Sequence, residues 1–204
     1  MPKTTAIHDC FFDSLQLIKP KININFPKVV QKKTMDELGR RSPEVIKESE
    51  KHPILIILDD VRSMHNVGSA FRTCDAFAIE ALYLCGYTPA PPHRDIHKTA
   101  LGATETVRWK NFATTADAVA DARQAGYKVF AVEQAHNSIP LHELKWENEK
   151  IALVFGNEVT GVNDEVLKVA DACIEIPQWG AKHSLNISVS LGVVLWELVR
   201  KPNP

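Results

Sequence analysis

The most informative stretch of this sequence reads Leu153-Val154-Phe155-Gly156-Asn157-Glu158-Val159-Thr160-Gly161. An apolar, strand-like run stops at Gly156, a carboxylate follows at Glu158, and the chain leaves the stretch through Gly161. Glycine lets a backbone turn sharply or come close to a ligand. In open α/β sheets, ligands bind outside the carboxyl ends of the strands. The stretch therefore predicts one wall of a ligand site.

Apolar runs alternate with helical patterns on either side of this stretch, and several of the runs are almost continuously apolar. Such runs are typical of parallel strands that are covered on both faces. The alternation predicts an α/β domain with a mainly parallel sheet and helices on both faces. Strands are expected at Ile54–Leu58, Ala81–Cys85, Lys128–Val132, Ile151–Phe155 and Cys173–Ile176, and helices at about Val67–Phe77, Thr115–Ala125, Asn163–Ala170 and Ser184–Arg200.

The chain divides into three parts by composition. Residues 1–33 have weak periodicity and are expected to form a loosely structured basic arm. Residues 34–52 predict an N-terminal helix, because Thr34 and Glu37 have the spacing of a capping box. Residues 53–204 form the main domain, in which the proline-rich segment Gly86–Thr104 is expected to be a long irregular loop.

The charge is distributed unevenly. The chain of 204 residues has a net charge of -1, but seven basic residues against two acidic ones lie between Lys19 and Arg41. Such an arm can attract phosphates. A solvated tail explains the same composition equally well, so both interpretations stay open at this point.

Several classes of protein are disfavoured. The four cysteines, Cys10, Cys74, Cys85 and Cys173, are far apart, which predicts reduced thiols in a cytoplasmic protein and no zinc or disulfide scaffold. The histidines do not form the His-Glu-x-x-His motif of zinc metalloproteases. No signal peptide is evident, and the longest apolar stretch is too short and too polar to span a membrane. We expect no metal and no membrane association.

A first polar cluster, from Asn66 through Gly68 to Arg72, opens a helix. Asn66 is expected to cap that helix, and Gly68 to permit close approach by a substrate or another chain. Arg72 lies among small and apolar residues, and its planar guanidinium suits phosphate oxygens. A capped helix with an arginine that reaches solvent is the plainer alternative.

A further polar cluster runs from Ile176-Pro177 to Ser184-Leu185-Asn186 and enters a largely apolar helix. Ser184 is expected to cap this helix, and Asn186 needs hydrogen-bond partners if it is buried. A helix that is apolar on most faces predicts a subunit interface. For Trp179, packing in the core is favoured over stacking on a base. Gly156–Gly161 lacks the glycine fingerprint of dinucleotide-binding enzymes and of phosphate-binding loops.

Taken together, these clusters resemble the three motifs of the SpoU (TrmH-type) branch of the SPOUT RNA methyltransferases. The resemblance covers about residues 53 to 200 and rests on the order of the motifs. They read Asn66-x-Gly68-x-x-x-Arg72, then Gly156-Asn157-Glu158-x-x-Gly161, then Ile176-Pro177-x-x-Gly180 with Ser184-Leu185-Asn186-x-Ser188. Gln178 and Trp179 depart from the residues usual in the family, which bears on the shape of that loop.

The resemblance implies a C-terminal trefoil knot, S-adenosylmethionine as cofactor and a homodimer with the final helix at its interface. Gly156, Ile176 and Leu185 are implied to contact the cofactor. The implied reaction is methylation of a ribose 2′-hydroxyl in tRNA or rRNA. Its implied site residues are Arg72, Glu158 and Asn186, with Asn66 and Ser184 beside them.

Two other activities stay open on the same scaffold: an RNA-binding protein without transfer activity, and an RNA methyltransferase that acts on a base nitrogen. Two roles also stay open for Arg72, which would act as a general base or as a clamp on an RNA phosphate. We expect Glu158 to orient Arg72 or the loop before Asn186, because a carboxylate beside RNA needs a cationic partner.

Overall fold

The structure is a computed structural model that describes residues 31–39, 42–181 and 184–200. The chain forms two compact units, residues 1–40 and 41–204. In the first unit, α1 (Met35–Leu38) begins with the predicted capping box between Thr34 and Glu37. The predicted helix over 34–52 is wrong in its length, because α1 ends at Gly39 in a left-handed conformation. A separate helix, α2 (Pro43–Glu48), starts at the Ser42 cap in the second unit.

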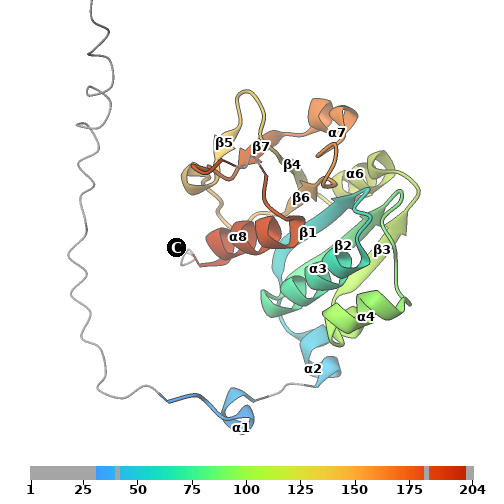
Figure 1. The fold of residues 1–204 in the computed structure, drawn as a ribbon, viewed down its shortest axis with the longest axis vertical. Coiled ribbons are helices and arrows are strands. Elements are labelled where there is room, and N and C mark those ends of the chain that lie inside the picture. Colours follow the sequence, from blue (N-terminus) through green and yellow to red (C-terminus); the bar gives the residue numbers. More distant parts are fainter. Residues whose placement is uncertain (1–30, 40–41, 182–183, 201–204) are drawn as a thin grey trace, which may run out of the picture. The chain divides into compact units, whose positions relative to one another are not determined.

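A single parallel sheet forms the centre of the second unit (Figure 1). Its strands stand in the order β3-β2-β1-β6-β4-β7-β5, and every pair of neighbours is parallel. The strands are β1 (His52–Asp59), β2 (Ile79–Cys85), β3 (Arg108–Phe112), β4 (Lys128–Val132), β5 (Ile139–Pro140), β6 (Ile151–Phe155) and β7 (Ala172–Glu175). The five predicted strands are confirmed. β3 and β5 were not predicted, because β3 is mostly exposed and polar and β5 is only two residues long.

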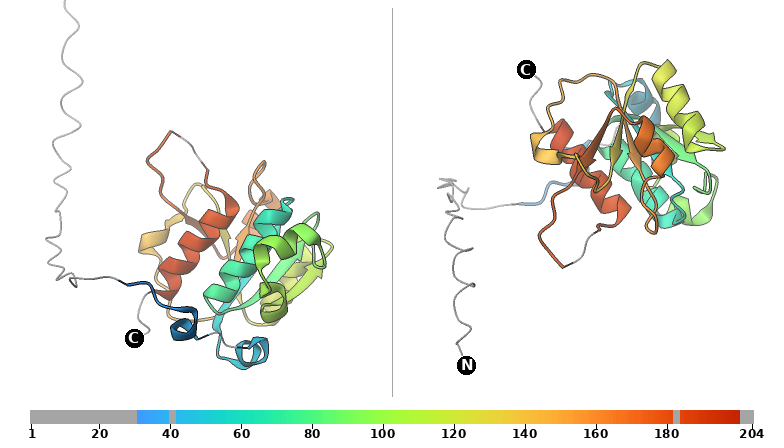
Figure 2. Two further views of the ribbon diagram at one scale, coloured as in Figure 1. Left: turned by 60° about the horizontal axis from the view of Figure 1, so that its bottom comes forward. Right: turned by 90° about the horizontal axis from the view of Figure 1, so that it is seen from above.

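Helices cover both faces of the sheet, as predicted (Figure 2). On one face, Ile54, Ile56 and Leu58 of β1 share a buried core with α3 and α8. On the other face, Leu55 and Ile57 pack with α6 and α7. The helices of this unit beyond α2 are α3 (Met64–Ala76), α4 (Arg94–Ala100), α5 (Ala103–Thr106), α6 (Thr115–Gln124), α7 (Asp164–Val169) and α8 (Ile187–Val199), with a 3-10 turn at Leu141–Glu143.

The segment predicted as a long loop, Gly86–Thr104, is wrong in its second half. There α4 begins at the His93 cap, whose side chain accepts a hydrogen bond from the Asp95 amide at 3.2 Å. Ile96 and Ala100 of α4 are buried. The prolines that suggested a loop lie before this helix, where they do not interrupt it.

The carboxyl ends of the central strands meet at one edge of the sheet. Asp59 at the end of β1 lies opposite Cys85 of β2, and Leu58 lies opposite Phe155 of β6. The chain reverses its direction of winding between β1 and β6, where open α/β sheets hold their ligands. The trefoil knot stays a prediction from the resemblance.

Gly68 brings α3 and α4 into close contact. A Cβ atom at this position would clash with Thr99 Oγ1 and with the backbone oxygen of Ile96. The Thr99 hydroxyl also donates a hydrogen bond to the backbone oxygen of His65 at 3.2 Å. The close approach that Gly68 permits is therefore with a helix of its own chain, which the sequence did not indicate.

We predict that Gly68→Ala lowers the free energy of unfolding by about 1–3 kcal/mol, because the added methyl group forces α3 and α4 apart. Urea unfolding at a fixed protein concentration measures the change. Ser69→Ala, one residue along the same helix, is the control and should be neutral or slightly stabilising. Equal stability of the two variants would contradict the packing assigned to Gly68.

Candidate active site

The three polar clusters meet at the side chain of Asn66. Its Nδ2 donates a short hydrogen bond to Glu158 Oε1. Its Oδ1 accepts hydrogen bonds from Asn186 Nδ2 at 3.2 Å and from Ser188 Oγ at 3.3 Å. One carboxamide thus joins α3, the loop after β6 and the start of α8. The structure thus brings Asn66, Glu158 and Asn186 together.

The caps of α3 and α8 both differ from the prediction. They explain why the Asn66 and Asn186 side chains can contact each other. Ser63 caps α3 by accepting a hydrogen bond from the Asn66 amide at 3.3 Å, so Asn66 lies inside the first turn. Asn186, and not Ser184, caps α8 by accepting a hydrogen bond from the Ser188 amide at 2.8 Å. The Asn186 side chain therefore caps its helix through oxygen and contacts Asn66 through nitrogen.

The loop after β6 holds Glu158 in place through the side chain of Asn157. The Asn157 Oδ1 accepts hydrogen bonds from the Val159 and Thr160 amides, both at 2.9 Å, which closes a tight turn. Gly156 lies so close to the returning backbone that a Cβ atom there would clash with Gly161. The motif Gly156–Gly161 thus shapes the loop after β6. The carboxylate of Glu158, on this loop, faces α3.

Arg72 lies two turns along α3 from Asn66, roughly 9 Å along the helix axis at the standard rise. Its side chain is exposed. Among the residues that the structure describes, the Arg72 guanidinium has no hydrogen bond or ion pair with Glu158 or with any other group. The expected partner of Glu158 is therefore replaced by Asn66. A planar cation without a protein partner suits an anionic ligand.

A cavity of about 110 Å³ lies beside this cluster, against the carboxyl ends of β4 and β6. The three predicted cofactor residues, Gly156, Ile176 and Leu185, all line it, together with Glu158 and Ser184. Arg72, Asn66 and Asn186 do not line it. The cavity is smaller than the roughly 300 Å³ of usual ligand pockets, so it fits one group of a cofactor.

Glu133, which was not predicted as a site residue, also lines the cavity. Its carboxylate accepts hydrogen bonds from the Val162 amide at 3.1 Å and the Gln134 amide at 2.8 Å. A Cβ atom at Gly161 would clash with the same carboxylate. Glu133 directly follows β4, so the rule about carboxyl ends that singled out Glu158 could have found it too.

Comparison with known proteins identifies the scaffold that carries this cluster. The sequence profile described as the SpoU rRNA Methylase family matches residues 53–196. The chain belongs to the SpoU methylase family.

Relatives with assigned names are RNA-modifying enzymes. A tRNA (guanosine(18)-2′-O)-methyltransferase of Aquifex aeolicus is 28% identical over 85% of this chain and 81% of its own length. The 23S rRNA (guanosine-2′-O-)-methyltransferase RlmB of Neisseria meningitidis is 30% identical over 78% of this chain, which spans 62% of that enzyme. The chain also spans only 66% of the Escherichia coli tRNA (guanosine(18)-2′-O)-methyltransferase.

Solved structures agree with this family membership. An AdoMet-bound rRNA methyltransferase from Sinorhizobium meliloti has a TM-score of 0.70 and 28% identity, over 80% of this chain and 62% of that one. The TrmH/SpoU tRNA-modifying enzyme of A. aeolicus has a TM-score of 0.68 and 27% identity, over 78% and 79% of the two chains. The fold is thus that of SpoU methyltransferases.

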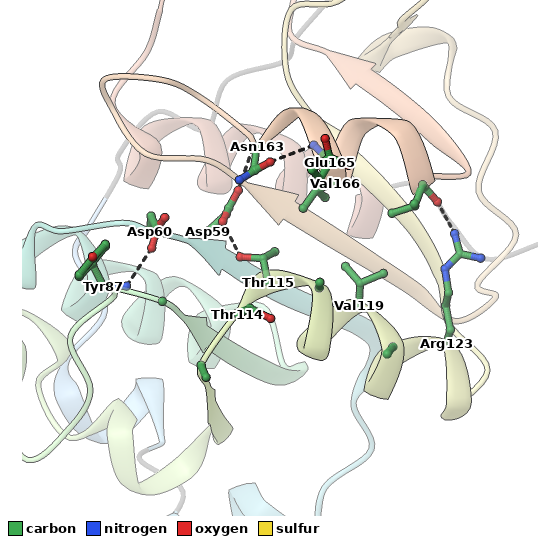
Figure 3. A pocket seen from close by; sticks show the side chains of 15 residues that line it. Asp59, Asp60, Tyr87, Thr114, Thr115, Val119, Arg123, Asn163, Glu165 and Val166 are labelled. Carbon is green, nitrogen blue, oxygen red and sulfur yellow. Dashed lines mark hydrogen bonds between the residues drawn. The ribbon is translucent and has the colours of Figure 1, made fainter.

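A larger cavity of about 990 Å³ lies elsewhere in this SpoU chain, between α6 and α7 (Figure 3). Asp59 lies at its floor and is only 3% exposed. The Asp59 carboxylate accepts a hydrogen bond from the Asn163 amide at 2.9 Å and a short one from the Thr115 hydroxyl. These bonds fasten both helices to β1, which gives Asp59 a structural role. The motif residues Arg72, Glu158 and Asn186 do not line this cavity.

The side chains in the described parts of the SpoU chain favour neither metal binding nor nucleophilic attack by a thiol. No group of three or more histidine, cysteine or carboxylate side chains could hold a metal ion within 31–39, 42–181 and 184–200. Cys74, Cys85 and Cys173 are free thiols. Burial raises the pKa of Cys85 to about 12, so this thiol stays protonated and is a poor nucleophile. Cys10 and His183 lie outside the described residues.

We predict that Asn66→Asp disconnects the cluster, because a carboxylate would then face Glu158 without a proton to donate. The free energy of unfolding should fall by about 1–3 kcal/mol at pH 8. Two facing carboxylates repel only when both are ionised, so part of the loss should be recovered at pH 5.

Urea unfolding at the two pH values measures this effect. Asn111→Asp, on the exposed part of β3, is the matched control and should show little change at either pH. An Asn66→Asp protein as stable as the parent chain at pH 8 would show that the hydrogen bond to Glu158 contributes nothing.

Proposed function

We propose that this SpoU chain transfers the methyl group of S-adenosylmethionine to a ribose 2′-hydroxyl in tRNA or rRNA. The single observation that carries the proposal is the junction at Asn66, which brings Glu158 and Asn186 together in one chain of this family. The names of the A. aeolicus and N. meningitidis relatives, one a tRNA and one an rRNA enzyme, specify 2′-O-methylation of guanosine. We place the protein in the cytoplasm, where its free thiols stay reduced.

The residues around the small cavity fit part of S-adenosylmethionine. Ile176 and Leu185 offer apolar side chains for a heterocyclic base, and Gly156 lines the same cavity. Glu133 and Glu158 offer acceptors for hydroxyl or ammonium groups. The cofactor supplies an activated methyl group, so positioning the ribose and removing its proton remain for the protein.

The amides and carboxylate around Asn66 provide the polar groups for the ribose. Asn66, Asn186 and Ser188 already satisfy one another, so their geometry is fixed before the RNA arrives. We assign Arg72 to the RNA phosphate, because a guanidinium is protonated at any working pH and is a poor proton acceptor. Ser184 lines the cavity and can bond the ribose or the cofactor.

Methyl transfer to RNA tests the function directly. With tritium-labelled cofactor and RNA from cells without the gene, we expect label in RNA, and in 2′-O-methylated nucleosides after digestion and mass spectrometry. Label in a base-methylated nucleoside would instead establish a base-nitrogen methyltransferase. RNA binding without any label would establish a binding protein on this scaffold.

We predict that Arg72→Ala lowers kcat/KM at least about 100-fold, because the phosphate of the target nucleotide loses its bidentate partner. If Arg72 is a clamp, Arg72→Lys should keep most of kcat and raise KM, since lysine binds phosphate as a point charge. Steady-state methyl transfer measures both parameters. Arg108→Ala, which removes an exposed arginine from β3, is the control. A lysine variant with kcat as low as that of alanine would contradict the clamp.

We further propose that the protein is a homodimer through α8. An exposed apolar stripe runs along this helix through Val189, Val193 and Trp196. Trp179, which was predicted to pack in the core, is instead 90% exposed. It lines an apolar groove of about 430 Å³ together with Val193 and Trp196. A second copy of the chain would cover this surface, as in a C2 interface where one patch meets itself.

We predict that Val189→Glu converts the dimer to a monomer, because an unpaired charge in the centre of an apolar interface is costly. Light scattering after gel filtration measures the mass. Val169→Glu is a matched control, because both valines are 51% exposed but Val169 lies on α7, across the sheet. A Val189→Glu protein with unchanged mass would exclude α8 as the interface.

The basic arm, residues 1–33, is proposed to bind RNA phosphates. Its residues 1–30 lie outside the described part of the chain. We predict that its deletion lowers the slope of log affinity against log salt concentration by about 0.9 for each phosphate that the arm neutralises. Replacing Lys19, Lys21 and Lys28 by glutamine at constant length is the matched test for charge. A slope that neither change alters would leave the arm a passive tail.

A further inference from the structure

The turn after β2 displays an aromatic side chain that belongs to none of the three motifs. Tyr87 is 76% exposed. Arg62, in the segment between β1 and α3, places its guanidinium carbon 5.5 Å from the centroid of the Tyr87 ring. The two side chains line a hollow of about 430 Å³. An exposed ring with an exposed guanidinium over it is an arrangement that stacks on planar groups.

Single exposed aromatic side chains are common on protein surfaces, but this one stands on a backbone that is tied down. The Tyr87 amide donates a hydrogen bond to Asp60 Oδ1 at 2.8 Å. The hydroxyl of Thr88, which is buried, accepts from the Val61 amide at 3.0 Å and donates to the Leu58 oxygen at 3.2 Å. Two hydrogen-bonded side chains, of which Thr88 is buried, therefore hold the backbone at and next to Tyr87.

The backbone here also adopts unusual angles. Asp60 has φ 55° and Gly86 has φ 58°, both in the left-handed region. A Cβ atom at Gly86 would clash with the Asp60 carboxylate. Left-handed residues other than glycine are uncommon, and they persist at functional sites where the surroundings hold them. The turn thus holds the backbone that carries Tyr87 in one conformation.

The ends of β2 and β6, which lead to Tyr87 and to Glu158, are close together in the sheet. The strands β2, β1 and β6 are neighbours in the sheet, and adjacent strands are about 4.8 Å apart, so the ends of β2 and β6 are roughly 10 Å apart. Arg62 precedes Asn66 by four residues. A nucleotide next to the target ribose would therefore reach the hollow between Tyr87 and Arg62.

Charge favours the Arg62 side of the ring. Tyr87 also borders the larger cavity of Figure 3, whose lining holds three carboxylates, Asp59, Asp60 and Glu165, against one guanidinium, that of Arg123, so it is less suited to a phosphate backbone. Arg62, in contrast, has no ion pair within the described residues. The hollow that it shares with Tyr87 is the side on which RNA would be attracted.

We propose that Tyr87 stacks on an unpaired nucleobase of the RNA substrate next to the methylated nucleotide, and that Arg62 binds the phosphate beside that base. This inference rests on the proposed function, since it assumes that the partner is RNA. Stacking on aromatic side chains is how proteins hold unpaired bases, and it is tolerant of sequence. The pair would therefore recognise an exposed base in a loop and not a base-paired helix.

Binding of labelled, unfractionated tRNA and of fragmented rRNA to the full chain tests the proposal by fluorescence anisotropy. Tyr87→Ala should weaken binding of at least one RNA about 5- to 150-fold, whereas Tyr87→Phe should stay within about twofold. Because stacking releases no counterions, Tyr87→Ala should leave the salt slope unchanged. Arg62→Ala should lower that slope by about 0.7–0.9.

Leu101→Ala is the control for the loss of exposed apolar surface, because the Leu101 side chain is comparably exposed, at 66%. In methyl transfer, Tyr87→Ala should raise KM for RNA and keep kcat at saturating RNA, with an unchanged melting temperature. The inference is overturned if Tyr87→Ala binds both RNAs like the parent chain, if Tyr87→Phe is as weak as alanine, or if Tyr87→Ala lowers the salt slope. A parent chain that binds RNA but methylates no ribose would overturn the proposed function alone, because the binding comparison needs no transfer.

Discussion

The arrangement of the active site depends on the orientation of one carboxamide. The amide nitrogen of Asn66 must point to Glu158, because a carboxylate accepts hydrogen bonds and donates none. Its oxygen then necessarily faces Asn186 and Ser188, which donate. No other orientation satisfies all three neighbours. The loop after β6 and the start of α8, which are about 90 and 120 residues away from Asn66 in the sequence, are thereby held against α3.

The sheet could be predicted from the sequence because its central strands are buried on both faces and read as continuous apolar runs. β3 could not, since an edge strand that is exposed and polar has no such pattern. The motif residues were predictable by type and order, but their partners were not. Whether Asn66 caps a helix or stands inside its first turn depends on Ser63, a competing cap three residues earlier that the motif does not contain.

Two glycines of the motifs allow segments of the chain to pack closely against each other. Gly68 and Gly156 were expected to admit a ligand or another chain, but both make room for backbone or side chains of their own chain. The close packing at Gly68 fixes α4 against α3, and the packing at Gly156 fixes the loop that carries Glu158. Gly156 nevertheless lines the small cavity together with Ile176 and Leu185.

The polar side chains of the candidate site fall into two sets: those with hydrogen-bond partners in the protein and those without an ion-pair partner. Asn66, Asn186 and Ser188 bond one another, and Glu133 and Asn157 bond backbone amides. Arg72 and Arg62, by contrast, are exposed cations that pair with no carboxylate in the described chain, and they lie on opposite sides of Asn66 along the sequence. Arg62 lies just before the first turn of α3, and Arg72 lies in the second half of this helix. The two proposals assign both cations to RNA phosphates, because neither is neutralised by a carboxylate of the described residues.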